Sequence, residues 1–256
     1  MQQAFIFPHK QRSPSPGMNA VTLLITLNVV FFVLFPGASL WQLALSADGF
    51  RHFRFWQIIS YMFLHGNFVH LLLNMWGLYL FGNHVYRRLG TQRFLMLYFL
   101  SGISGSLLWL LFNWNSPSSV IGSSGAVFGV MMAAAVLSPE RRMMLLFPPI
   151  PVKLKTLVFV FAGIEILSEL SNLQGGVAHL AHLGGFLGAY LYMGRLSGAT
   201  LLDMLKSPFS GVSITGSSPR QSSVNRQTFE RIMAEIEEIE KEENRKQSGH
   251  PDDRAQ

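Results

Sequence analysis

The chain has 256 residues, of which 49% are hydrophobic and only 13% are charged, about half the charged fraction of an ordinary soluble domain. So few charges leave too small a polar surface for a wholly soluble protein of this length. The absence of cysteine excludes a disulfide-stabilised secreted fold and a zinc site built on thiolates. The basic excess lies between apolar runs, as charges flanking membrane segments do, and not in a nucleic-acid-binding patch.

Six apolar segments predict an all-α membrane protein, a bundle of six transmembrane helices. A helix needs roughly 20 apolar residues to cross about 30 Å of hydrocarbon. The connection between the first two segments is aromatic but too charged for a clean span, so we expect it to lie in the membrane interface. The predicted spans are residues 18–35, 68–86, 94–114, 123–138, 152–171 and 178–193, and the connection is 36–67.

Lysine and arginine in the loops predict the orientation of these spans. With the N-terminus in the cytoplasm, eleven basic residues fall in cytoplasmic loops and two, Arg51 and Arg54, fall outside. Both termini are therefore expected on the cytoplasmic side. The N-terminus shows no clean signal-peptide cleavage site and no evident transit peptide, so we expect a bacterial cytoplasmic membrane.

Three regions follow from this pattern. Residues 1–17 form a short cytosolic leader, 18–197 the six-span membrane domain and 198–256 a cytosolic tail. Within the tail, apolar residues at helical spacing predict a charged amphipathic helix over about 228–246. We expect this helix to bind a partner or to mediate self-association, without chemistry of its own.

Polar side chains inside membrane segments are costly, so each is a functional candidate. The second, fourth and sixth spans all run inwards from the outer side, and each carries such residues near its start. These residues, which are 50 to 60 positions apart, should therefore meet in the outer half of the membrane. The polar residues within spans are His70, Asn74, Ser123, Ser124, Glu165, Glu169, His179 and His182.

The fourth segment is too short to reach the outer surface. Its 16 or so residues extend only about 24 Å as a helix, and the charges after Pro139 mark its cytoplasmic end. Ser124, at its start, should therefore lie below the surface. Non-helical backbone at that depth needs protein or water around it, and the polar loop 115–122 could line such a cavity.

These residues contain the parts of an acyl-transfer site. A serine hydroxyl needs a neighbouring base to become a nucleophile, and His182 could supply it for Ser124. The free N–H groups at a helix start and the amide of Asn74, with His70 one turn away, could stabilise an oxyanion. Nothing in the sequence points Glu165 or Glu169 at His182, so a Ser–His dyad is the simpler interpretation.

Each motif also has a structural explanation. Gly122-Ser-Ser-Gly125 at a helix start is often only close-packing sequence, and His182 lies beside a Gly184-xxx-Gly188 packing pattern. His70 and Asn74 could simply link helices by hydrogen bonds. The expected meeting of all four at one depth favours the catalytic interpretation.

The chain resembles the rhomboid family of intramembrane serine proteases across residues 18–197. The matching stretches are Met62-Phe-Leu-His-Gly-Asn-Phe-Val-His-Leu-Leu-Leu-Asn74, Gly122-Ser-Ser-Gly-Ala-Val-Phe-Gly129 and Ala181-His-Leu-Gly-Gly185. The resemblance implies cleavage of other membrane proteins in or near their transmembrane segments, without a metal or other cofactor, and the fifth span as the lateral gate for the substrate. It implies Ser124 as nucleophile, His182 as general base, and an oxyanion hole of His70, Asn74 and the Ser124 N–H, with Gly122 as its small residue and Phe128 packed on the base.

One departure concerns the first external loop, where relatives often have Trp-Arg and this chain has Trp56-Gln57. Three other functions stay open. The first is a catalytically inactive rhomboid-like chaperone or scaffold. The second is a metal-dependent protein using His65, His70, His179 and His182, although no clear carboxylate ligand accompanies them. The third is a small transporter using Glu165 and Glu169, although no internal repeat is apparent.

Overall fold

The described part of the chain is built mainly from helices. The structure, a computed structural model, describes residues 19–35, 40–144, 149–171, 179–198 and 238. The predicted leader 1–17 and, apart from Glu238, the predicted tail helix 228–246 lie outside these residues.

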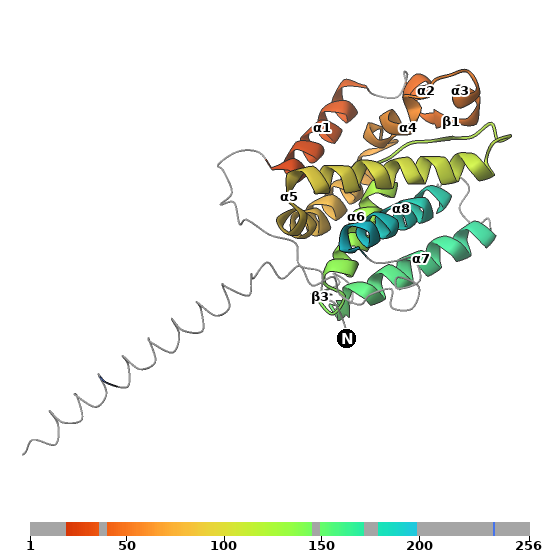
Figure 1. Cartoon of the computed structure of the whole chain (residues 1–256). Coiled ribbons are helices and arrows are strands. Elements are labelled where there is room, and N and C mark those ends of the chain that lie inside the picture. The colour runs from red at the N-terminus through yellow and green to blue at the C-terminus, as the bar shows by residue number, and fades with distance from the viewer. Residues whose placement is uncertain (1–18, 36–39, 145–148, 172–178, 199–237, 239–256) are drawn as a thin grey trace, which may run out of the picture. The chain divides into compact units, whose positions relative to one another are not determined.

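Five long helices and several short elements make up this part (Figure 1). The long helices are α1 (Ala20–Leu34), α5 (Phe68–Phe112), α6 (Ser124–Leu137), α7 (Leu154–Ser171) and α8 (His179–Ser197). The short helices are α2 (Leu40–Leu43), α3 (Ala47–Arg51), α4 (Gln57–Ser60) and the 3₁₀ turn η1 (Tyr61–Phe63). The strands are β1 (Leu45–Ser46), β2 (Ser119–Val120), β3 (Arg142–Met144) and β4 (Pro151–Lys153).

Helix α5 is two rods joined at Gly90. Its backbone there has φ 76° and ψ 173°, which is not helical, and a positive φ is accessible to glycine at little steric cost. The rods 68–89 and 91–112 coincide with the second and third predicted spans. With α1, α6, α7 and α8 there are thus six rods at the six predicted segments, displaced at their ends by up to four residues.

Length and apolarity distinguish α5 from the other helices. Among the described residues it is the one helix that satisfies both criteria for crossing a membrane, while α1 and α6 are apolar but shorter. Large apolar side chains are nevertheless exposed on several helices, including Leu73 (60%), Leu111 (71%) and Leu170 (79%). Such an extensive apolar surface is unusual for a soluble monomer, so it agrees with a lipid environment. The crossing of all six rods and their direction stay predictions.

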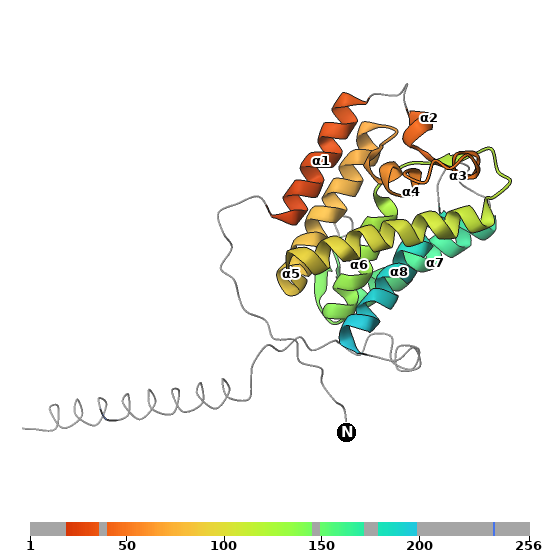
Figure 2. The same cartoon turned by 45° about the horizontal axis from the view of Figure 1, so that its top comes forward.

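Helix α6 lies at the centre of the bundle, beside α8 and with α5 and α7 around them (Figures 1 and 2). Eleven of its 14 residues are buried, most of them glycine, alanine or valine. These small residues let neighbouring helices approach closely. A Cβ on Gly185 of α8 would lie 1.9 Å from the carbonyl oxygen of Gly125, so the two backbones are in direct contact.

The predicted Gly184-xxx-Gly188 face also packs against a helix. A Cβ on Gly184 would lie 2.7 Å from the carbonyl oxygen of Ser104, and one on Gly188 would lie 2.5 Å from Ser104 Cβ. Both contacts are with the second rod of α5, so α8 is held between that rod and α6 by small residues on two of its faces.

The connection 36–67 is ordered where it is described, and it is joined to the loop before α6. Strand β1 pairs antiparallel with β2, and the N–H of Gly122 donates to the carbonyl of Tyr61 at 2.9 Å. Gln57, at the position of the departure from the family pattern, is fully buried and donates to the carbonyl of Gln42 at 3.2 Å. This glutamine therefore stabilises the fold of the first loop internally.

The contact between α6 and α8 predicts a strong effect of one methyl group. Gly185→Ala should lower the free energy of unfolding by about 1–3 kcal/mol, because the added Cβ meets the Gly125 carbonyl and overpacks the interface. Thermal unfolding in detergent would measure this effect. Gly163→Ala on α7 is the matched control, since a Cβ there meets nothing within 4 Å. Equal melting temperatures for both variants would contradict the proposed packing.

Candidate active site

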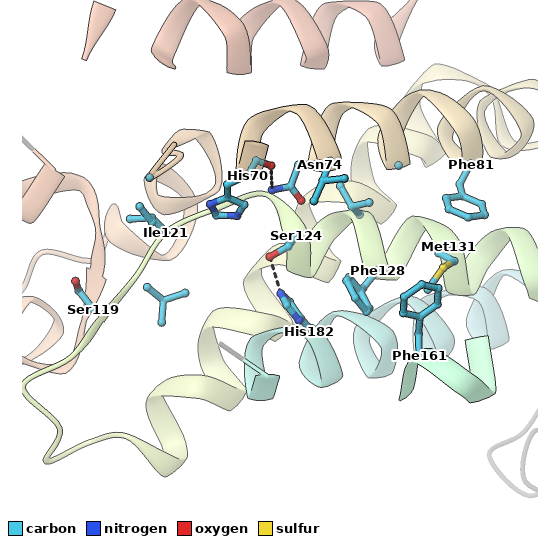
Figure 3. Close-up of a pocket in the computed structure, with 15 residues that line it drawn as sticks. His70, Asn74, Phe81, Ser119, Ile121, Ser124, Phe128, Met131, Phe161 and His182 are labelled. Carbon is cyan, nitrogen blue, oxygen red and sulfur yellow. Dashed lines mark hydrogen bonds between the residues drawn. The ribbon is translucent and has the colours of Figure 1, made fainter. Parts of the chain in front are cut away.

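The structure brings Ser124 and His182 together. Ser124 is the first residue of α6 and His182 lies in the first turn of α8. The Ser124 hydroxyl oxygen lies 2.7 Å from His182 Nε2, although the residues are 58 positions apart (Figure 3). The nucleophile and base inferred from the sequence are therefore within hydrogen-bond distance.

Phe128 holds the plane of the histidine ring. It lies on the same helix one turn after Ser124, and its ring stacks on His182 with centroids 4.4 Å apart and planes 5° from parallel. The packing that the family resemblance implied for Phe128 is present in the structure. Because the stack restricts rotation of the imidazole, it keeps Nε2 directed at the serine.

Gly122 allows the chain to turn closely past His70. Its φ of 122° lies in a region that residues with a Cβ rarely adopt. A Cβ at this position would lie 2.7 Å from His70 Nε2 and 3.7 Å from Ser124 Oγ. A side chain here would therefore fill the space between the serine and His70.

His70 and Asn74 both face this space from α5 (Figure 3). One hydrogen of the Asn74 amide is used in a 3.1 Å bond to the His70 carbonyl, which orients the side chain. An amide nitrogen carries two hydrogens, so the other can be donated to a ligand. The N–H of Ser124, in the first turn of α6, has no partner within the helix and is a further donor.

One cavity of about 550 Å³ is lined by all four polar residues of the site, Ser124, His182, His70 and Asn74. Ser119, Val120 and Ile121 also contribute, so the loop predicted to line a cavity beside the serine does so. The other end is apolar, where Phe81, Met131 and Phe161 from three different helices meet (Figure 3). The cavity thus joins a polar end, at the reactive pair, to an apolar end between the helices.

His65 supports this site from the loop before α5. It is buried, its Nε2 lies 3.4 Å from Ser123 Oγ, and its ring lies 5.0 Å from that of His70. Burial lowers the pKa of His65 to about 4, because a charged ring would lose its hydration. His65 is therefore uncharged at neutral pH.

The sequence interpretation missed the position of Glu165. This residue of α7 is buried, and its Oε2 accepts a 2.5 Å hydrogen bond from His179 Nδ1. The same oxygen lies 3.0 Å from His182 Nδ1. Glu169, one turn later, is exposed, so the two glutamates do not form the shared polar face that a transporter would use. The feature of the sequence that could have indicated a role for Glu165 was the cost of placing a carboxylate in an apolar helix. The sequence could not show which neighbouring side chain this carboxylate contacts.

Glu165, His179 and His182 are also the one group of potential metal ligands among the described residues, with ligand atoms within 4.8 Å of one another. The carboxylate ligand that the sequence did not reveal is thus present. Three protein ligands are one fewer than a closed structural zinc site requires, but they equal the number at a catalytic zinc site. Here one carboxylate oxygen already lies against both rings, so direct contacts account for the cluster.

Comparison with known proteins agrees with this architecture. Residues 52–198, more than half of the chain, match the family model described as a Rhomboid domain. The chain is 36% identical to RHOMBOID-like protein 4 of Arabidopsis thaliana over 139 residues, which cover 53% of this chain and 32% of that protein. It is 29% identical to the rhomboid protease GluP of Bacillus subtilis over 135 residues, which cover 53% of this chain and 25% of that protein.

A third relative matches over a longer segment. The mitochondrial Rhomboid protein 1 of Saccharomyces cerevisiae is 30% identical over 192 residues, covering 68% of this chain and 52% of that protein. The match thus spans about half or less of each relative's own length. With the domain match and the geometry of the site, these similarities show that the chain belongs to the rhomboid family of membrane proteins.

Proposed function

We propose that the protein is an intramembrane serine endopeptidase that hydrolyses peptide bonds in or near transmembrane segments of other membrane proteins. The observation that carries the proposal is the 2.7 Å contact between Ser124 Oγ and His182 Nε2 at the polar end of the cavity. The name of one relative, the rhomboid protease GluP of Bacillus subtilis, supports the same activity.

The reaction begins when His182 Nε2 takes the proton of the Ser124 hydroxyl as the oxygen attacks the substrate carbonyl. The carbonyl oxygen becomes negative, and the donors around it are Asn74 Nδ2, the His70 ring and the N–H of Ser124. His182 then returns the proton to the amine that leaves. A water molecule, activated by the same base, hydrolyses the acyl-enzyme and regenerates the serine.

The cavity suggests how a membrane substrate is received. Its apolar end is bordered by Phe161 of α7 and Phe81 of α5, so an apolar segment could lie there while its peptide bond reaches the polar end. We propose a multi-pass protein of a cytoplasmic membrane, with six spans, both termini inside and the active site opening on the extracytoplasmic side. No nucleic acid or cofactor takes part in this proposal, and the tail remains a proposed region of self-association.

An inactive rhomboid-like scaffold is the alternative function. The scaffold would need the helix bundle and the cavity but not the Ser124–His182 pair. Loss of the Ser124 hydroxyl would therefore abolish the protease activity but leave a scaffold function intact.

Ser124→Ala should abolish cleavage of a transmembrane substrate in detergent, because the nucleophile is removed. His182→Ala should do the same. The measurement is substrate cleavage on gels, together with labelling by a fluorophosphonate probe and mapping of the labelled residue. Ser118→Ala is the matched control, since this exposed serine is not among the residues that line the cavity. Undiminished cleavage by folded Ser124→Ala protein would exclude the proposed mechanism.

Asn74→Ala should lower kcat by about 10²–10³, as expected for loss of one oxyanion donor, with little change in KM. Steady-state cleavage kinetics would show this. Asn83→Ala is the control, because the Asn83 amide makes the same type of bond to its own helix, 3.0 Å to the Tyr79 carbonyl, away from the residues that line the cavity. If the two variants had the same kcat, Asn74 would have no part in the oxyanion hole.

A further inference from the structure

Glu165 is the buried carboxylate of the described helices, and the proposed reaction leaves it without a role. It lies on α7, is 7% exposed, and directs Oε2 at α8. That oxygen lies 3.0 Å from His182 Nδ1, the ring nitrogen opposite the one that contacts Ser124. Glu165, His182 and Ser124 thus form a continuous series of polar contacts from α7 through α8 to α6.

The two contacts of His182 favour one tautomer of its ring. A neutral imidazole has one N–H and one lone pair. If Nδ1 carried the lone pair, it would face a carboxylate oxygen at 3.0 Å, and two electron-rich atoms at that distance repel each other. With the hydrogen on Nδ1, the lone pair is on Nε2, where it can accept the proton of Ser124.

We infer that Glu165 is a positioning residue for the base: its carboxylate holds His182 in the tautomer that can accept the serine proton and stabilises the imidazolium formed during the reaction. This inference rests on the proposed function and adds a third member to the predicted dyad. The carboxylate touches neither the substrate nor the reacting atoms. No bond to it forms or breaks, and its own charge is unchanged through the cycle.

The geometry sets the size of the effect. The Nδ1–H of His182 is not aligned with Oε2 as in a full hydrogen bond, and His179 donates to the same oxygen at 2.5 Å. The carboxylate therefore acts on His182 mainly through its charge. We expect a smaller effect than the roughly 10⁴-fold known for an aligned aspartate in a serine protease, about 10- to 100-fold.

The position of Glu165 on α7 introduces a second possible effect. A change at Glu165 could alter the packing of α7 against α8 through His179, instead of altering the base. Altered packing of α7 would change entry of a large substrate, whereas an altered base would change the reactivity of Ser124 towards any reagent. A small fluorophosphonate probe, which needs no helix displacement, separates the two.

Three variants of the full chain in detergent provide the test. Glu165→Gln removes the charge and keeps the size. Glu169→Gln makes the same change one turn along α7 on an exposed residue and is the matched control. His179→Ala removes the other partner of the carboxylate and shows what the link between α7 and α8 contributes by itself. Melting temperatures establish that each variant is folded.

Glu165→Gln should lower both the rate of fluorophosphonate labelling at Ser124 and the kcat of cleavage by about 10- to 100-fold, with KM nearly unchanged. Glu169→Gln should match the parent protein, and His179→Ala should retain most of the labelling rate. Normal labelling of Glu165→Gln with slow cleavage would overturn the inference in favour of a packing role for α7. An equal loss of labelling rate in His179→Ala would overturn the inference too, since the link between α7 and α8 would then explain the slower labelling.

The tautomer of His182 gives a readout that needs no activity. With ¹⁵N-histidine labelling, and with the His182 signal assigned by its loss in His182→Ala, the parent protein should show the hydrogen on Nδ1, and Glu165→Gln should shift the population towards Nε2–H. An unchanged tautomer would overturn the inference.

The zinc content of the protein provides a second check. If the parent protein bound one equivalent of zinc and Glu165→Gln did not, the inference would be overturned, because the cluster would then be a metal site. If the parent protein neither labels nor cleaves, the proposed function fails, while the NMR result still decides the role of Glu165.

Discussion

The close contact between α6 and α8 is the constraint on which the site depends. Ser124 begins one helix and His182 lies in the first turn of the other, so their distance is set by how near the two backbones come. Gly125 and Gly185 bring backbone against backbone at this level. In an apolar environment, where burial of apolar side chains does not drive association, such close van der Waals packing is a main source of helix–helix stability. The same glycines therefore serve both stability and the geometry of the reactive pair.

Most polar side chains of the site are paired with another polar group within an apolar bundle. Asn74 is held by the His70 carbonyl, Ser124 by His182, and Glu165 by His179. Each contact lowers the cost of placing a polar group away from water. It also restricts a side chain that the reaction needs in one orientation, and the stacked ring of Phe128 does the same for the base without a hydrogen bond. The hydrogen bonds that pair these polar groups therefore also orient side chains for the reaction.

Connections outside the long helices complete the cavity. The pairing of β1 with β2 and the bond from Gly122 to Tyr61 join the first loop to the residues before Ser124. The positive φ of Gly122 lets that segment pass His70 closely enough for serine and oxyanion donors to share one space. The buried Gln57 holds the same loop from within, so the departure from the family pattern at this position is accommodated by local hydrogen bonds.

The helical segments follow from the amino-acid sequence alone, because apolar runs and their glycine and polar boundaries are local properties of the chain. The sequence also singled out Ser124, His182, His70 and Asn74 as candidates, because polar side chains within apolar segments are costly, whereas the place of Gly122 in the oxyanion hole was implied by the resemblance to the rhomboid family. It predicted separate spans on either side of Gly90, but it did not show that a kink at this one residue joins them, or which of two glutamates one turn apart is buried. The contact of Glu165 with His179 and His182 depends on tertiary packing, because the neighbouring helices α6 and α8 set the rotation of α7 about its axis. A helical period places residues on a face, but the neighbouring helices determine what that face contacts.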